Sequence, residues 1–222
     1  MIDLLIKLPS RSRLELFKEK LESCIELLSN QINVKFIFSF DTNDEIMNNN
    51  VVRYYLNSKK INMEYFYGVS KNKVDACNRD IPKEGWKVLL LMSDDMLPIQ
   101  KNFDKTIYND MMRHFPDLDG CLNYNTHKEA FKNRTMVLSV MGKKYYDRFN
   151  YIYYPGYQSI YCDNEQTDVA IKLNKLVDID NRIISHEWSS VKDDLRKHTE
   201  STEFRNHDSV LYNNRKANGF YI

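Results

Sequence analysis

Two adjacent carboxylates, Asp94 and Asp95, directly follow the most apolar segment of the sequence, which runs from Trp86 to Met92. Two acids this close repel each other unless a cation or a basic group is shared between them. Mg²⁺ or Mn²⁺ is a natural partner, because such an ion takes one or two carboxylates and keeps other positions for water and phosphate oxygens. The pair therefore predicts a divalent metal that holds a diphosphate-bearing substrate. The alternative is that the two acids cap a helix beginning after Pro98.

The elements that must position these acids alternate along the chain. Apolar runs predict strands at 2–8, 34–40, 63–67, 86–92, 120–124, 135–141 and 182–185. Helical spacing of apolar residues predicts helices at 13–28, 48–58, 75–79, 103–115, 143–149 and 166–173. This alternation is typical of an α/β fold whose mostly parallel sheet is covered on both sides. Ligands of such sheets sit beyond the carboxyl ends of the strands, where the two acids lie.

Length and composition favour a single α/β domain. The 222 residues are enough for one large core, and the polar stretch from 189 to 222 is predicted to be a tail that packs on the body or closes over the site. A net charge of +1 gives no overall field for a nucleic acid or an anionic membrane. The chain has no Cys-x-x-Cys pair, which excludes a zinc ribbon or a dithiol motif and suits a reducing cytoplasm. It shows no export signal and no apolar run near about 20 residues, so we expect a cytoplasmic protein without membrane insertion.

Five short motifs follow predicted strands in a fixed order. They are Leu8-Pro9-Ser10-Arg11-Ser12-Arg13, Phe40-Asp41, Asn72-Lys73-Val74-Asp75-Ala76-Cys77-Asn78, Ser93-Asp94-Asp95-Met96 and His186. Together they resemble the motifs of GT-A glycosyltransferases, in the small family-2-like form found in bacteriophages, large DNA viruses and bacterial glycan loci. The resemblance implies a GT-A (Rossmann-like) catalytic domain over 1–188, located in the host cytoplasm if the source is viral. It also implies sugar transfer from a nucleoside diphosphate sugar, with UDP the favoured nucleotide, to a hydroxyl acceptor with inversion.

Within this resemblance, the first three motifs bind the nucleotide. The implied nucleotide-binding residues are Pro9, Ser10 and Arg11 in the first loop, Asp41 on the base, Lys73 on the phosphates and Asn78 in positioning. Arg11 and Lys73 also have an alternative interpretation as solvated surface charges.

The metal site implied by the resemblance involves three residues. The first position of the usual Asp-x-Asp motif is Ser93, so Asp95 becomes the direct ligand of Mn²⁺ or Mg²⁺ and Asp94 contacts the ribose or a metal-bound water. His186 closes the site, since a neutral imidazole is an acceptable ligand for Mn²⁺. A structural histidine is the alternative.

The general base implied by the resemblance lies at the start of a late helix. Asn164 stands where the base of a strict Glu-Asp motif would fall, so the role passes to Asp163, the first choice, or to Glu165. The alternative is that Asp163 caps this helix and Glu165 favours its positive end.

The acceptor and the reaction class leave alternatives open. The resemblance admits a glycan, a modified DNA base or a protein side chain as acceptor. A nucleotidyltransferase also uses paired aspartates and a metal, although it usually has a Gly-rich loop after the first strand, where this chain has Pro-Ser-Arg-Ser-Arg. A binding module without turnover is the third interpretation.

Overall fold

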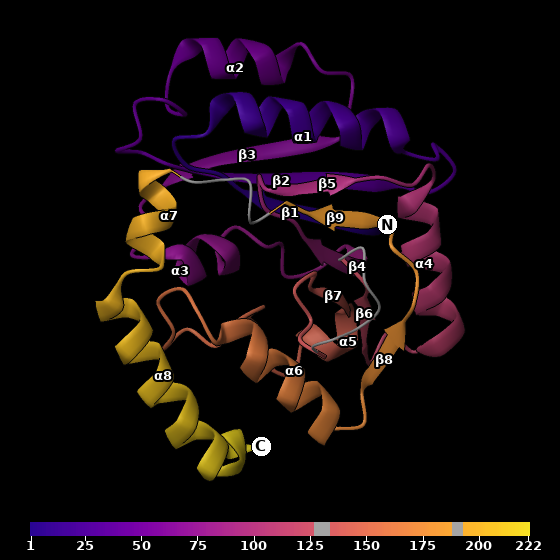
Figure 1. Cartoon of the computed structure of the whole chain (residues 1–222). Helices are drawn as coiled ribbons and strands as arrows, with labels where there is room; N and C mark the ends of the chain where they lie inside the picture. Colours follow the sequence, from indigo (N-terminus) through magenta and orange to yellow (C-terminus); the bar gives the residue numbers. More distant parts are fainter. Residues whose placement is uncertain (127–133, 188–192) are drawn as a thin grey trace.

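A computed structural model describes residues 1–126, 134–187 and 193–222. Within these ranges the strands form a seven-stranded sheet with the order β3-β2-β1-β4-β7-β6-β8 and a two-stranded sheet of β5 and β9 (Figure 1). The strands of the large sheet are β1 (Ile2–Pro9), β2 (Val34–Asp41), β3 (Met63–Gly68), β4 (Trp86–Leu91), β6 (Cys121–Tyr124), β7 (Val140–Gly142) and β8 (Leu176–Ile179). The small sheet pairs β5 (Met96–Pro98) with β9 (Ile184–His186).

The large sheet is mostly parallel, as predicted. Strands β3, β2, β1 and β4 pair in parallel, and β8 is parallel to β6. Only β7, among the described strands of this sheet, runs antiparallel to its neighbours β4 and β6. The carboxyl ends of β1, β2 and β4 therefore meet at one edge of the sheet.

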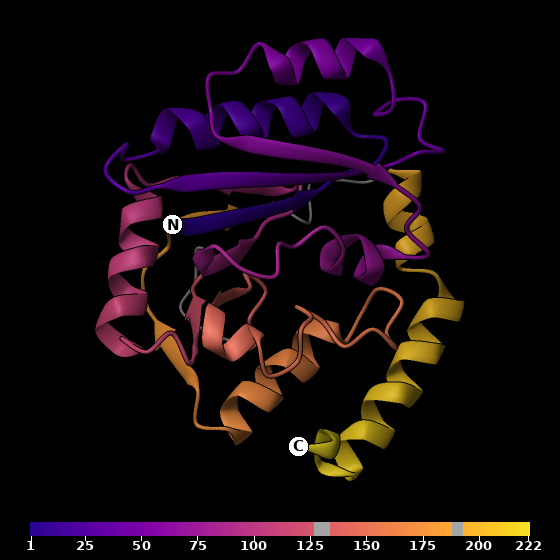
Figure 2. The same cartoon turned by 180° about the vertical axis from the view of Figure 1, so that it is seen from behind.

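Helices cover both faces of the large sheet. The described helices are α1 (Leu14–Leu27), α2 (Asn50–Asn57), α3 (Lys73–Asn78), α4 (Phe103–His114), α5 (Lys143–Tyr146), α6 (Cys162–Lys172), α7 (Asp194–Thr199) and α8 (Thr202–Ala217). One core joins the sheet to α1, α2 and α4, and the other joins it to α3, α5 and α6. Figures 1 and 2 show these two layers from opposite sides.

The sequence pattern accounts for these layers. Strand β1 buries Leu4, Leu5 and Ile6, so it presents apolar side chains to both faces, as expected for a parallel strand between two helix layers. Helix α1 buries Phe17, Leu21 and its neighbours on one face, because their spacing of four residues follows the helical period.

Some predicted elements differ from the structure. The strand predicted at 135–141 is observed only as the short β7, Val140–Gly142. The backbone N–H of Met136 donates to Thr167 rather than to a neighbouring strand. Helix α6 begins at Cys162, earlier than predicted. The prediction missed its first turn because the residues there are mostly polar and show no apolar periodicity. Strand β5 follows the acid pair, and the helix after Pro98, α4, has Asn102 as its N-cap, so the helix-capping alternative for Asp94 and Asp95 is wrong.

The described part of the C-terminal tail forms helices α7 and α8. The Asp208 carboxylate of α8 accepts hydrogen bonds from the backbone N–H groups of Gln158, Ser159 and Ile160, and Arg215 pairs with Glu165 on α6. These contacts hold α8 against the body. The predicted boundary between 188 and 189 lies outside the described residues.

Candidate active site

A cavity of about 680 Å³ opens at the carboxyl ends of β1, β2 and β4. All but two of the residues predicted for the site line it, namely Pro9, Ser10, Arg11, Asp41, Lys73, Asp94, Asp95, Asp163 and His186. The two that do not line it are Asn78 and Glu165. The cavity lies where a parallel α/β sheet is expected to bind a ligand, and its volume is within the usual range for small-molecule sites.

The turn after β4 brings Asp95 and His186 together. The pairing of β5 with β9 sets Met96 opposite His186, so that Nε2 of His186 lies 3.4 Å from Oδ2 of Asp95. Burial would raise the pKa of Asp95, but the hydrogen bond and charge of His186 and the hydroxyl of Ser93 outweigh burial and lower this pKa below its ordinary value. Asp95 is thus held as a carboxylate facing the cavity.

These two side chains fit a divalent metal as a pair of protein ligands. A carboxylate and an imidazole are ligand types that Mn²⁺ accepts, and such ions commonly complete their coordination with phosphate oxygens and water. No group of three or more His, Cys, Asp or Glu side chains with ligand geometry occurs within the described ranges. A metal at Asp95 and His186 would therefore need oxygen ligands from the substrate or solvent.

Asp94 points into a different environment from Asp95. Ser10 Oγ donates to Oδ2 of Asp94 at 2.8 Å, and Arg13 Nη1 lies 2.7 Å from Oδ1. Asp94 is nearly buried, with 4% of its surface exposed. Through these bonds Asp94 ties the first loop to the turn after β4. Its side chain is 5% exposed and that of Asp95 is 14% exposed, so Asp95 is the more available carboxylate.

Arg13 was not assigned a role from the sequence, although it ends the first-loop motif. Its guanidinium also binds Asp193, at the start of α7, through Nε at 2.5 Å and Nη2 at 2.8 Å. Burial would lower the pKa of Arg13, but the bonds to Asp193 and Asp94 outweigh burial and raise it. Arg13 thereby connects the turn after β4 to the C-terminal helices, which contribute Leu195 and Phe204 to the cavity wall.

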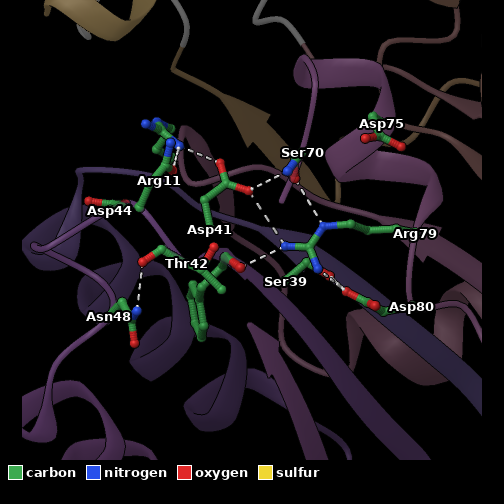
Figure 3. A network of polar contacts seen from close by, with 12 residues as sticks. Arg11, Ser39, Asp41, Thr42, Asp44, Asn48, Ser70, Asp75, Arg79 and Asp80 are labelled. Carbon is green, nitrogen blue, oxygen red and sulfur yellow. Dashed lines mark hydrogen bonds and ion pairs between the residues drawn. The ribbon is translucent and has the colours of Figure 1, made fainter. Parts of the chain in front are cut away.

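Asp41 ends β2 within a network of polar contacts, shown in Figure 3. Arg11 Nη1 lies 2.6 Å from Oδ2 of Asp41, and the backbone N–H of Ser70 donates to Oδ1 at 3.1 Å. Arg79 Nη2 lies 3.7 Å from the same Oδ1. These donors orient the carboxylate at the cavity wall, where it can still accept a hydrogen bond from a ligand.

Lys73 is a cation in the cavity wall that is available to a ligand. Its side chain is exposed and forms no hydrogen bond or ion pair with any residue that the structure describes. The cavity wall desolvates the ammonium and would lower its pKa, but Cys162, Cys77 and the carboxylates of Asp163 and Asp95 together raise it. Lys73 is thus a charged amine near Asp95 and Asp163.

Asp163 and Glu165 occupy different environments although they share the first turn of α6. Asp163 lines the cavity, and its Oδ1 accepts a hydrogen bond from the backbone N–H of Asn164. Its side chain does not cap the helix, because residue 161 is the N-cap and makes no side-chain cap bond. Asp163 therefore remains a candidate base.

Glu165 turns away from the cavity into the protein. Arg215 donates to both of its carboxylate oxygens at 2.8 Å, and the hydroxyl of Tyr157 donates to Oε2 at 2.8 Å. The Glu165 side chain is 5% exposed and lies outside the lining of the large cavity. This placement does not support the expectation that Glu165 serves as the base.

Asn78 also lies outside the cavity lining. Its Oδ1 accepts hydrogen bonds from the backbone N–H groups of Ile152 and Tyr153, each at 3.0 Å, and its Nδ2 donates to the carbonyl of Tyr153. Tyr153 lines the cavity. Asn78 thus supports the cavity wall through Tyr153 and does not line the cavity itself.

Comparisons with solved structures define the class of fold. The mannosyltransferase PcManGT from Pyrobaculum calidifontis in complex with GDP-Man and Mn²⁺ matches with a TM-score of 0.64 and 12% identity, over 81% of this chain and 54% of that one. TarS residues 1–349 from S. aureus, in complex with UDP-GlcNAc, match with a TM-score of 0.64 and 13% identity, over 86% of this chain and 62% of that one. The chain therefore has a GT-A-like fold, as the sequence motifs predicted.

Comparisons with family models and with curated protein sequences add no relative to these structures. No family model and no curated protein sequence matches the chain. The chain spans about 54% of the length of PcManGT and 62% of TarS 1–349, so it corresponds to part of each.

None of the helices in the described ranges is long and apolar enough to cross a bilayer.

Proposed function

We propose that this protein is a glycosyltransferase that moves a sugar from a nucleoside diphosphate sugar to a hydroxyl acceptor. The observation that carries the proposal is the convergence of Asp95, His186, Lys73 and Asp163 on one cavity at the carboxyl ends of the parallel strands. The solved GT-A structures with a similar fold contain GDP-Man with Mn²⁺, or UDP-GlcNAc, which supports the same ligand class.

In this proposal the donor binds to the cavity-lining residues that come from the N-terminal half of the chain. Asp41 accepts a hydrogen bond from the base, Pro9, Ser10 and Arg11 border the nucleoside, and Asp94 fixes the first loop. Lys73 neutralises the diphosphate, because it lines the cavity near Asp95 and Asp163 and has no hydrogen-bond or ion-pair partner among the described residues. UDP is the favoured nucleotide on the sequence resemblance.

Asp95 and His186 would hold Mn²⁺ or Mg²⁺ against the diphosphate. When bound, such an ion supplies a Lewis acid where negative charge develops on the departing phosphate. Lys73, which lines the same cavity, adds to this charge stabilisation.

Asp163 acts as the general base. It accepts the proton of the acceptor hydroxyl while that oxygen bonds to the anomeric carbon, and the electron pair of the broken C–O bond leaves with the diphosphate. A single displacement of this kind inverts the configuration at the anomeric carbon. The proposal therefore includes inversion, with Asp163 on the acceptor side of the cavity.

The test is a thermal-shift screen of UDP, GDP, CDP and dTDP, each with and without Mn²⁺. We expect one nucleotide to raise the unfolding midpoint in a metal-dependent manner, because ligands of the native state stabilise it by mass action. The Asp95→Ala variant should lose the metal-dependent part of that shift. If none of the four nucleotides stabilises the protein under either condition, the proposal fails.

A further inference from the structure

Lys7 is a fully buried lysine in β1 that the proposed mechanism does not use. Lysine is rarely buried without a partner, because removing its charge from water is costly. Its Nζ donates a hydrogen bond to Ser39 Oγ on the neighbouring strand β2. Ser39 Oγ in turn donates to Oδ2 of Asp80 at 2.5 Å, and Arg79 Nη1 also contacts Oδ2, at 2.6 Å. Ser39, Asp80 and Arg79 are visible in Figure 3.

These contacts fix what the Ser39 hydroxyl can offer. A serine hydroxyl has one proton to donate and two lone pairs that accept. The proton is given to Asp80, and one lone pair receives the proton of Lys7. The one position that these contacts leave on the hydroxyl is a lone pair, so Ser39, which is part of the cavity wall, can accept a hydrogen bond but cannot donate one.

Ser39 lies beside the carboxylate proposed to contact the base. It precedes Asp41 by two positions on β2, and side chains at this spacing point to the same face of a strand. A carboxylate is likewise only an acceptor. The nucleoside end of the cavity thus has two neighbouring acceptor groups built into β2.

We propose that Ser39 determines nucleotide specificity by accepting a hydrogen bond from the nucleoside, and that Lys7 and Asp80 fix this polarity. The inference rests on the proposed function. It favours bases whose ring nitrogen carries a proton, N3–H of uracil or N1–H of guanine. Cytosine and adenine present a ring lone pair at the corresponding place, which would face acceptors and stay unpaired.

The experiment is calorimetric titration of UDP, GDP, CDP and ADP, with Mn²⁺ present, into the wild-type protein and the Ser39→Ala and Asp80→Asn variants. The exposed Ser58→Ala change is the matched control, since Ser58 lies outside the cavity lining. We expect the wild-type protein to bind UDP or GDP at least about tenfold more tightly than CDP and ADP. Ser39→Ala should weaken binding of the preferred nucleotide about fivefold and reduce the affinity ratio between the preferred and the other nucleotides. Ser58→Ala should change neither the affinity nor this ratio.

Asp80→Asn tests the polarity itself. The introduced amide can donate to Ser39 Oγ, which frees the serine proton to point into the cavity. We therefore expect the ratio of UDP or GDP affinity to CDP or ADP affinity to fall about tenfold. Ser39→Ala keeps the buried Lys7 near the opposite charge of Asp80, so this variant should fold even if Asp80→Asn does not. The thermal unfolding midpoints of both variants show whether each one is folded.

The outcomes separate this inference from the proposed function. If the wild-type protein binds a nucleotide but Ser39→Ala binds it with the same affinity and the same preference, the role of Ser39 is refuted while the glycosyltransferase proposal stands. A wild-type preference for CDP or ADP also refutes it. Binding of none of the four nucleotides overturns both.

Discussion

Changing Glu165 to Gln tests whether this acid is structural or chemical, which its position in the first turn of α6 leaves open from the sequence. The substitution keeps the side-chain shape and removes the negative charge. In the folded protein that charge faces the guanidinium of Arg215, whose Nε and Nη2 each lie 2.8 Å from a carboxylate oxygen. Arg215 also stacks over the ring of Tyr154, with its Cζ 3.4 Å from the ring centroid.

The expected loss of stability follows from the burial of this pair. The side chains of Arg215 and Glu165 are 10% and 5% exposed, so removal of one partner leaves the other charge buried and uncompensated. Breaking such a pair typically costs 3–5 kcal/mol, and because glutamine keeps one acceptor oxygen we expect about 3 kcal/mol. For a chain of this size that corresponds to a fall of roughly 6–12 °C in the unfolding midpoint.

The assay compares Glu165→Gln with Asp163→Asn in thermal unfolding and in hydrolysis of the donor. Asp163 is half-buried and makes no ion pair within the described residues, so Asp163→Asn should unfold within about 1 kcal/mol of the wild-type protein. Its hydrolysis rate should fall about 100-fold or more, as for a lost general base. A Glu165→Gln protein that unfolds like the wild type but has lost turnover would refute this division of roles.

Two further predictions concern buried charges. Burial lowers the pKa of Lys7 to about 8, although Asp80 and Cys77 oppose the effect, so between pH 8 and 10.5 the unfolded chain binds more protons than the folded one and the stability attributable to Lys7 rises with pH. Denaturant unfolding of the wild type and of Lys7→Met checks this. From pH 8 to 10.5 the free energy of unfolding of the wild type should rise by about 3 kcal/mol relative to that of Lys7→Met. A constant difference between the two proteins would contradict the shifted pKa of Lys7. Asp208→Asn should cost about 3 kcal/mol in urea unfolding, because the fully buried carboxylate accepts three backbone N–H groups that an amide cannot all satisfy. The exposed Asp194→Asn change is its control, and equal stability of the two variants would show that the Asp208 bonds contribute little.

Much of the fold was predictable because its strongest signals are local. The apolar run ending at Met92 identifies the central strand β4, and an acid pair directly after such a strand has to lie at the sheet edge. The polar residues after β1 and β2 follow the same rule, which is why they line the same cavity.

The roles of the two acids on α6 depended on a helix start that the sequence obscured. The predicted helix began at residue 166, whereas α6 begins at Cys162 and includes both Asp163 and Glu165. Residues two apart on a helix point about 200° away from each other, so only one of the pair can face the cavity. With the correct start, helical phase alone would have separated the base candidate from the buried acid.

Contacts between distant parts of the chain had no sequence signal of this kind. The bond from Arg13 to Asp193 joins residues 180 positions apart, and nothing near either residue indicates the other. A lysine within a mostly apolar strand indicates a buried polar partner, but the identity of the groups near Lys7 follows only from the folded structure, where Ser39 lies on β2 and Asp80 in the turn after α3.

The most direct test of the proposed site is Mn²⁺ binding measured by electron paramagnetic resonance, with the nucleotide selected in the thermal-shift screen. We predict that the nucleotide increases the amount of protein-bound Mn²⁺ in the wild type and in an Asp147→Asn surface control, and that this increase is lost in Asp95→Asn and in His186→Ala. Undiminished nucleotide-dependent Mn²⁺ binding in both of these variants would contradict a metal site at Asp95 and His186.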